Sequence, residues 1–250
     1  MIKLENTEVI GWEAAIRGMR NPMNSWEKSD SVFSTVEGDY YTINSDTGPS
    51  PITFPNDLEI GDADHKLMMN LAKAGSVDAK YRRMIVVTVD ITAPLYWWKE
   101  FDTYKVGTVA NSCSTMHKIH SKEFARDDFS HEHLVEYGAP EDVPVIAIGE
   151  GTSTIENEIR RFWPSDILDL TIAMLNRSRQ MFLETKDKSY WWQMIQLLPS
   201  SYNQRRTVML NYEVLAGIYP KRKDHKLDEW HDFCDWIKSL PYSEIITLEE

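Results

Sequence analysis

The chain has 250 residues, of which 42% are hydrophobic and 26% are charged, so it is long enough for one large or two small domains with a substantial core. Its formal net charge of −12 argues against a general nucleic-acid or anionic-membrane binder, because such surfaces need excess lysine and arginine. Any phosphate ligand must therefore meet a local basic cluster. Cys113 and Cys234 give neither a disulfide framework nor a zinc spacing, and no apolar run approaches the roughly 20 residues of a membrane span. We therefore expect a cytoplasmic protein.

The first part of the chain predicts a strand, a short helix, a hairpin and a second helix. Residues 2–10 alternate loosely with period two, and residues 12–19 suit a short helix. Within residues 29–55, the alternating stretches VFSTV and YYTI are typical of a hairpin, and the glycine and prolines from position 48 onward indicate a loop after it. Residues 58–74 predict a helix that ends at Gly75.

The central stretch predicts a buried strand followed by a polar surface. Residues 84–91 form a short β-branched run, which favours a strand over a helix. Thr92 then suits the N-cap of a helix over residues 95–101, with Pro94 in its first turn. The helix-prone segment that follows carries more polar groups than a core element holds, and we interpret it as a binding surface: Asp102, Thr103, Tyr104, Lys105, Thr108, Asn111, Ser112, Ser114 and His117.

Beyond residue 120 the sequence is first acidic and irregular and then helical. His131 and His133 flank Glu132, but no third ligand stands at a suitable spacing, and we predict no metal site. Residues 143–148 predict a short strand, and Ser153 with Glu156 predicts a capping box. Apolar stripes predict helices over residues 167–182 and 190–198, a helix from an Asn203 cap to Tyr219, and a last helix over residues 227–237.

Two stretches carry a recognisable order of motifs. The first runs from the strand at residues 84–91 through an aromatic-rich helix to Gly107, Thr108, Asn111, Ser112 and Ser114. The second follows Leu198-Pro199, with Asn211, then Lys221 and Arg222 in a basic turn, and then His225. Together they resemble the flavin-dependent thymidylate synthase family, whose hallmark is RHRxxSxNExSxRY. Thr103, Tyr104 and Lys105 stand here in place of Arg-His-Arg, and Glu213 stands where the family has an arginine.

The resemblance implies an α+β fold with a central sheet and a bundle of long helices. It implies one domain over residues 1–250, with insertions at 29–56 and 121–152, and a homotetramer whose active sites are shared between subunits. The implied reaction is the methylation of dUMP, in which NADPH reduces FAD and methylenetetrahydrofolate supplies the carbon. The missing arginines favour a second hypothesis, a non-catalytic protein that binds or sequesters a nucleotide, as a phage could use against a nucleotide-signalling defence. A third is that only the fold is shared.

The candidate ligand residues follow from the resemblance and from the position of the charges. A phosphate needs fixed cationic donors, and a pyrimidine needs neutral polar contacts and a stacking surface. For a small-molecule nucleotide we name Arg82, Lys99, Lys105, Thr108, Asn111, Ser112, Ser114, Arg205, Arg206, Lys221 and Arg222. For FAD we name Tyr104, Asn211 and His225, and we assign no catalytic residue. Trp97 and Trp98 are interpreted as packing residues.

Overall fold

The computed structural model describes residues 2–33, 40–43, 52–55, 58–136, 145–148, 158–161 and 163–249. Contacts within the chain divide it into two compact units, residues 1–112 with 204–250 and residues 113–203. The insertions predicted at 29–56 and 121–152 stay predictions. No described helix is long and apolar enough to cross a membrane.

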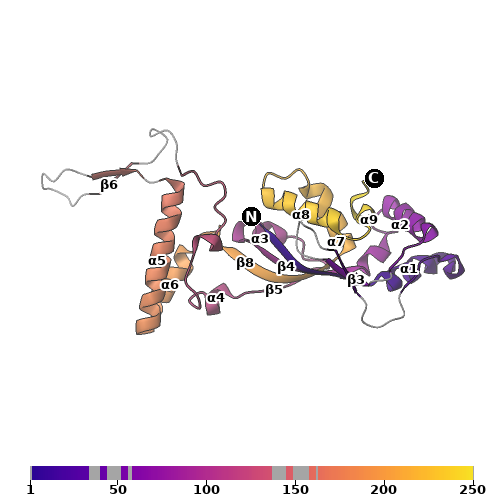
Figure 1. Cartoon of the computed structure of the whole chain (residues 1–250), viewed down its shortest axis with the longest axis horizontal. Helices are drawn as coiled ribbons and strands as arrows, with labels where there is room; N and C mark the ends of the chain where they lie inside the picture. Colours follow the sequence, from indigo (N-terminus) through magenta and orange to yellow (C-terminus); the bar gives the residue numbers. More distant parts are fainter. Residues whose placement is uncertain are drawn as a thin grey trace. The chain divides into compact units, whose positions relative to one another are not determined.

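The first unit is built on a mixed sheet, in which the described residues form six strands in the order β2-β3-β1-β4-β8-β5 (Figure 1). β1 pairs antiparallel with β4 and parallel with β3, while β5 pairs antiparallel with β8. The strands are β1 Lys3–Ile10, β2 Tyr40–Ile43, β3 Ile52–Pro55, β4 Val86–Pro94, β5 Val109–Ser112 and β8 Asn203–Asn211.

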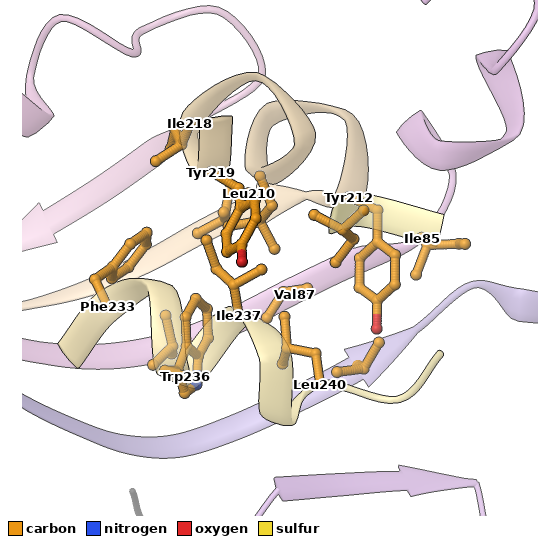
Figure 2. Close-up of a cluster of buried hydrophobic side chains, with 14 of the residues drawn as sticks. Ile85, Val87, Leu210, Tyr212, Ile218, Tyr219, Phe233, Trp236, Ile237 and Leu240 are labelled. Atoms are coloured by element: carbon orange, nitrogen blue, oxygen red, sulfur yellow. The ribbon is translucent and has the colours of Figure 1, made fainter. Parts of the chain in front are cut away.

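Helices pack on one face of this sheet. In β4, Val87, Val89 and Ile91 are buried, whereas the alternate residues Thr88 and Asp90 are partly exposed. Figure 2 shows side chains of helices α7 (Tyr212–Arg222) and α8 (Asp228–Ser239) packed with those of β4 and β8. The helices of this unit are α1 Trp12–Arg20, α2 Asp62–Ala74, α3 Leu95–Phe101, α7 Tyr212–Arg222, α8 Asp228–Ser239 and α9 Glu244–Thr247, with 3-10 turns at η1 Asn21–Met23, η2 Trp26–Lys28 and η3 Lys80–Arg83. Trp97 and Trp98 are 0% and 1% exposed, which confirms their role in packing.

The second unit is organised around two long helices that pack against each other, α5 Pro164–Thr185 and α6 Lys188–Leu197 (Figure 1). Leu168 and Leu175 of α5 and Met194 of α6 form a small core with Phe124 and Phe129. The other described elements are α4 Thr115–Lys118, η4 Arg126–Asp128, and β6 Val145–Ile148, which pairs antiparallel with β7 Glu158–Arg161. The predicted long helix over residues 167–182 and the short one over residues 190–198 are thus confirmed, while the predicted capping box at residues 153–156 lies outside the described residues.

The largest correction concerns residues 203–211, which we expected to form a helix capped by Asn203. They form strand β8, and the helix begins at Tyr212 with Asn211 as its N-cap. Val208 and Leu210 are 0% exposed and Met209 is 37% exposed, which is the period-two burial of a strand. The polar run that opens the strand hides this alternation in the sequence.

Three further expectations were wrong because strand pairing overrides local preference. Residues 52–55, expected in a loop, form β3, which pairs with β2 and with β1, so the hairpin partner of YYTI lies after it in the chain. Residues 109–112, expected to be helix-prone, form β5 beside β8. Strand β4 continues through the expected cap at Thr92, and Pro94 is the N-cap of α3.

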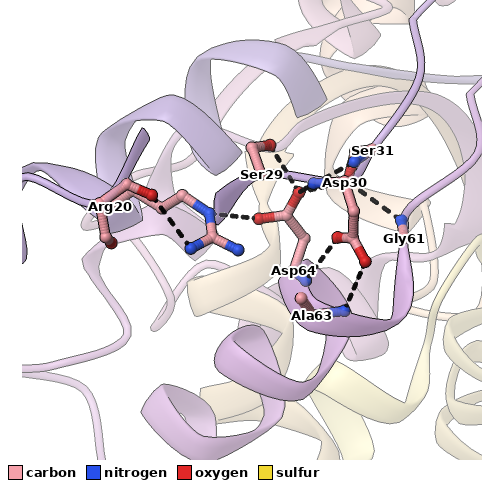
Figure 3. Close-up of polar contacts among 8 residues, drawn as sticks. Arg20, Ser29, Asp30, Ser31, Gly61, Ala63 and Asp64 are labelled. Carbon is pink, nitrogen blue, oxygen red and sulfur yellow. Dashed lines mark hydrogen bonds and ion pairs between the residues drawn. The ribbon is translucent and has the colours of Figure 1, made fainter. Parts of the chain in front are cut away.

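A buried carboxylate ties the start of α2 to the segment after η2 (Figure 3). Asp64 is 0% exposed and accepts hydrogen bonds from Arg20 Nε at 2.6 Å, Ser29 Oγ at 2.7 Å and Ser31 Oγ at 2.7 Å. The backbone N–H groups of Asp30 and Ser31 also donate to it, each at 3.1 Å. Burial alone would raise the pKa of Asp64, but these hydrogen bonds and the Arg20 charge outweigh it and lower the pKa below its usual value.

The turn from β1 into α1 depends on glycine. Gly11 has a φ of 97°, in the left-handed region, and a Cβ there would lie 2.0 Å from the backbone oxygen of Met84. By contrast, Gly75 has a φ of 110° but would meet nothing within 4 Å. The first glycine therefore allows two backbone segments to approach closely, whereas the second only ends α2.

Candidate nucleotide site

Three of the predicted site residues meet at the C-terminal end of α7. Arg222 donates from Nη1 to Glu100 at 2.5 Å and from Nε to the hydroxyl oxygen of Tyr104 at 2.9 Å. Glu100 also accepts a hydrogen bond from Trp230 Nε1 at 3.0 Å, and His225 Nε2 lies 3.4 Å from the same carboxylate oxygen. We call Glu100, Tyr104, Arg222, His225 and Trp230 the Glu100 cluster.

Packing fixes the Arg222 guanidinium within this cluster. Its central carbon lies 4.4 Å from the ring centroid of Trp230 and 5.6 Å from that of Tyr104, within the range of cation–π attraction. Trp230 is fully buried among Trp97, Phe101 and Phe233, so the aromatic core holds one wall of the cluster. The cluster therefore presents a permanently charged fork, held in a single orientation, beside an aromatic wall.

Hydrogen bonding also fixes the tautomer of His225. Its Nδ1 accepts a hydrogen bond from the backbone N–H of Leu227 at 3.2 Å, so in the neutral imidazole the proton resides on Nε2. This places an N–H donor toward Glu100. Glu100 and Trp230 were missed as site residues in the sequence, because Glu100 meets Arg222 across 122 positions of chain and Trp230 shows only a core periodicity.

A second group gathers at the N-terminal end of α7. Arg82 is 4% exposed and its Nη1 lies 3.5 Å from Oε2 of Glu213, so the glutamate that stands in place of the family's arginine pairs with a cation from η3. Nε and Nη2 of Arg82, and Oγ1 of Thr108, are buried without a hydrogen-bond partner in the described part of the chain. Gly107, with a φ of 79°, brings its backbone against Asn211 and Val214. We call Arg82, Gly107, Thr108, Asn211 and Glu213 the α7 N-terminal cluster.

Arg205 belongs to neither cluster but to the partly exposed face of the sheet. It pairs with Glu5 at 3.1 Å and with Asp90 at 2.8 Å. Asp90 also accepts hydrogen bonds from Thr207 Oγ1 at 2.5 Å and Asn6 Nδ2 at 2.9 Å, and these donors, Thr207 foremost, lower its pKa to about 2. Arg205 therefore neutralises acidic side chains of neighbouring strands.

The remaining predicted ligands are dispersed. Lys99, Lys105 and Lys221 are exposed, and Asn111 and Ser112 lie on the exposed strand β5. Arg206 stacks on Trp98 at 4.1 Å and pairs with Asp102 at 2.8 Å. Ser114 lies in the second unit, where it caps α4 by accepting the His117 N–H at 3.0 Å. Among the described residues, no group of three or more His, Cys, Asp and Glu side chains is arranged to hold a metal ion.

The residues predicted for FAD already bond within the protein, and the unpaired donors belong to other residues. Asn211 Oδ1 accepts the Val214 N–H at 3.0 Å, so its acceptor caps α7. Tyr104 and His225 already bond within the Glu100 cluster. The groups left without a partner in the described part of the chain are instead Nε and Nη2 of Arg82 and Oγ1 of Thr108. They lie near the start of α7, where the Tyr212 N–H already donates to the Ile85 oxygen at 3.1 Å. Buried unpaired donors of this kind suit an anionic oxygen, which would lie beside the Glu213 carboxylate that pairs with Arg82.

No family model matches the sequence, and no curated protein matches it. Solved structures do match. A thymidylate synthase X (ThyX) from Helicobacter pylori with FAD and dUMP gives a TM-score of 0.60 at 12% identity, over 99% of this chain and 98% of that chain. The chain has the fold of the flavin-dependent thymidylate synthases. This confirms the predicted α+β fold class.

Two further structures agree. A flavin-dependent ThyX from Helicobacter pylori complexed with FAD and dUMP gives a TM-score of 0.60 at 13% identity, over 98% of each chain. The UMP/dUMP methylase PolB from Streptomyces cacaoi, bound with 5-Br dUMP, gives 0.54 at 12% identity, over 99% of this chain and 94% of that chain. The structural similarity thus extends over both units of the chain.

Proposed function

We propose that the chain binds a pyrimidine nucleotide such as dUMP or UMP at the Glu100 cluster. The observation that carries the proposal is the fixed Arg222 guanidinium, held between Tyr104 and Trp230 in a fold whose solved neighbours bind dUMP. A planar, permanently charged donor suits a phosphate or an anionic uracil, and an aromatic wall suits a base. Lys105 and Lys221, both exposed, supply further positive charge in the nearby sequence.

For FAD, the fit is to the α7 N-terminal cluster. Arg82 and Thr108 would hold an anionic part of the cofactor through their buried groups that have no partner in the described part of the chain. When bound, FAD supplies hydride for the reductive methylation of the pyrimidine. The chain's own part is to orient the nucleotide through Arg222 and to limit its freedom against the partly exposed ring of Tyr104.

A second candidate function is nucleotide binding or sequestration without catalysis. It is supported by Thr103, Tyr104 and Lys105 in place of Arg-His-Arg, since Lys105 is exposed and Tyr104 is bonded to Arg222. A protein with this role would need the Glu100 cluster but no flavin. The two candidates therefore differ in one measurable property, the presence of FAD.

We also propose that the chain forms a homo-oligomer, and specifically the tetramer that the family resemblance implies. Ile167, Leu170 and Met174 of α5 are 47%, 49% and 54% exposed and recur at helical spacing. Such a stripe on one long helix is typical of a subunit interface.

The first experiment is a visible absorption spectrum of the natively purified protein, followed by mass spectrometry of any small molecule released on denaturation. Flavin bands would support the methylating enzyme, and a colourless protein that releases a nucleotide would support sequestration.

Calorimetric titration with dUMP and UMP then tests the location. Arg222→Ala should weaken binding at least about tenfold, because it removes a charged, partly buried contact. Lys105→Ala should weaken it less. Lys226→Ala removes an exposed cation four positions from Arg222 and serves as the matched control. Unchanged affinity in the Arg222 and Lys105 variants would remove the proposed location.

A further inference from the structure

The Glu100 carboxylate accepts more donors at one oxygen than an ordinary surface ion pair provides. Oε2 receives Arg222 Nη1 at 2.5 Å and Trp230 Nε1 at 3.0 Å, and His225 Nε2 lies at 3.4 Å. These donors come from three places in the chain, the end of α7, the following turn and α8. Two N–H groups therefore donate to one carboxylate oxygen, and a third nitrogen lies close to it, a set of donors that suits an anionic oxygen.

The burial of these groups shows which member is the outermost. Trp230 is 0% exposed, and the side chain of Arg222 is 15% exposed. Glu100 is 35% exposed, more than His225 at 25%. The carboxylate therefore covers donors that lie deeper in the protein.

We propose that Glu100 is a built-in competitor for the anionic group of the nucleotide. This rests on the proposed function and adds regulation to the same site: in the free protein the carboxylate occupies the position that a phosphate or anionic uracil oxygen takes in the complex. A ligand anion and the Glu100 carboxylate cannot both bind to the donors of Arg222, Trp230 and His225, because two like charges at one oxygen site repel strongly.

The same donors also constrain how a ligand can replace the Glu100 carboxylate. If Glu100 swings out to solvent, the fully buried Trp230 N–H and the Arg222 guanidinium lose their acceptor. A buried donor left without a partner costs about 1–3 kcal/mol, and more when it is charged. Neutral ligands without an acceptor oxygen therefore cannot displace the carboxylate, whereas an oxyanion replaces both its charge and its hydrogen bonds.

The test compares variants that differ in charge at a single position. Glu100→Gln keeps the side-chain shape and an acceptor oxygen for Trp230 but removes the competing charge. Asp235→Asn removes the same charge from an exposed pair with Lys238 on α8 and is the matched control. Each variant, and the double variant E100Q with R222A, is titrated calorimetrically with dUMP and separately with inorganic phosphate. A melting curve confirms that each is folded.

We expect Glu100→Gln to bind dUMP and phosphate at least about tenfold more tightly than the unaltered protein, with Asp235→Asn changing affinity less than about twofold. Adding Arg222→Ala should abolish the gain. If the unaltered protein binds dUMP and Glu100→Gln binds it equally or more weakly, the competitor role is overturned while the nucleotide proposal stands. If Glu100→Gln gains phosphate binding but no form binds dUMP, the competitor role stands and the nucleotide proposal falls. Binding of neither anion by any form overturns the competitor role.

Discussion

The buried Asp64 network allows a quantitative prediction. Replacing Asp64 with alanine removes the carboxylate that pairs with Arg20, a residue only 4% exposed, and five hydrogen bonds that converge on that carboxylate. Breaking one side of a buried ion pair typically costs about 3–5 kcal/mol, because the remaining charge stays desolvated. The serines are only partly buried, so water can reach them, and we expect the Arg20 charge to dominate the loss.

Urea denaturation followed by tryptophan fluorescence measures the change in the free energy of unfolding. Arg17→Ala, which removes an exposed pair with Glu13 on the same helix as Arg20, should change stability by less than about 0.5 kcal/mol. The difference between the unaltered protein and Asp64→Ala should be full above the ordinary aspartate value of 3.8 and should shrink as pH falls through the lowered pKa of Asp64. A loss below about 1 kcal/mol at neutral pH would refute the argument, as would a loss that acid leaves unchanged.

Three further measurements address the fold and the assembly. Gly11→Ala should lower the free energy of unfolding by more than about 3 kcal/mol, because its Cβ would lie 2.0 Å from a backbone oxygen. Gly75→Ala would meet no atom within 4 Å and should cost about 1 kcal/mol of backbone strain. Equal losses of the two variants in urea unfolding would contradict this. The hydrogen bonds that lower the pKa of Asp90 to about 2 stabilise the fold fully above pH 3.8, and this stabilisation is lost as the pH falls toward 2. Allowing for solvent screening, Thr207→Val should reduce the free energy of unfolding by about 1 kcal/mol at pH 5 and by less at pH 2. Met174→Glu should reduce the mass measured by light scattering, and an unchanged mass would exclude α5 from the interface.

The sequence predicted elements well where one pattern dominates over a whole element. The β-branched run of β4 and the apolar stripe of α5 are both found as expected. It failed where pairing partners decide, as in residues 52–55, whose turn-like composition gives no sign that β1 and β2 lie on either side. The Glu100 cluster shows the same limit, because its carboxylate and Arg222 are distant in sequence. The resemblance suggested Arg222 as a candidate ligand, but only the fold shows that Glu100 and Tyr104 already accept hydrogen bonds from its guanidinium.

The order of the chain through the two units has a consequence for synthesis. Ser112 pairs with Arg206 in neighbouring antiparallel strands, so residues 113–203 stand where a short hairpin turn of about two to five residues usually connects such strands. Strand β8 lies between β4 and β5 in the sheet, and it emerges from the ribosome after the whole second unit. The residues of α5 and α6 are therefore all synthesised before β8 is. Strands β4 and β5 can join one sheet only after β8, which lies between them, has been synthesised.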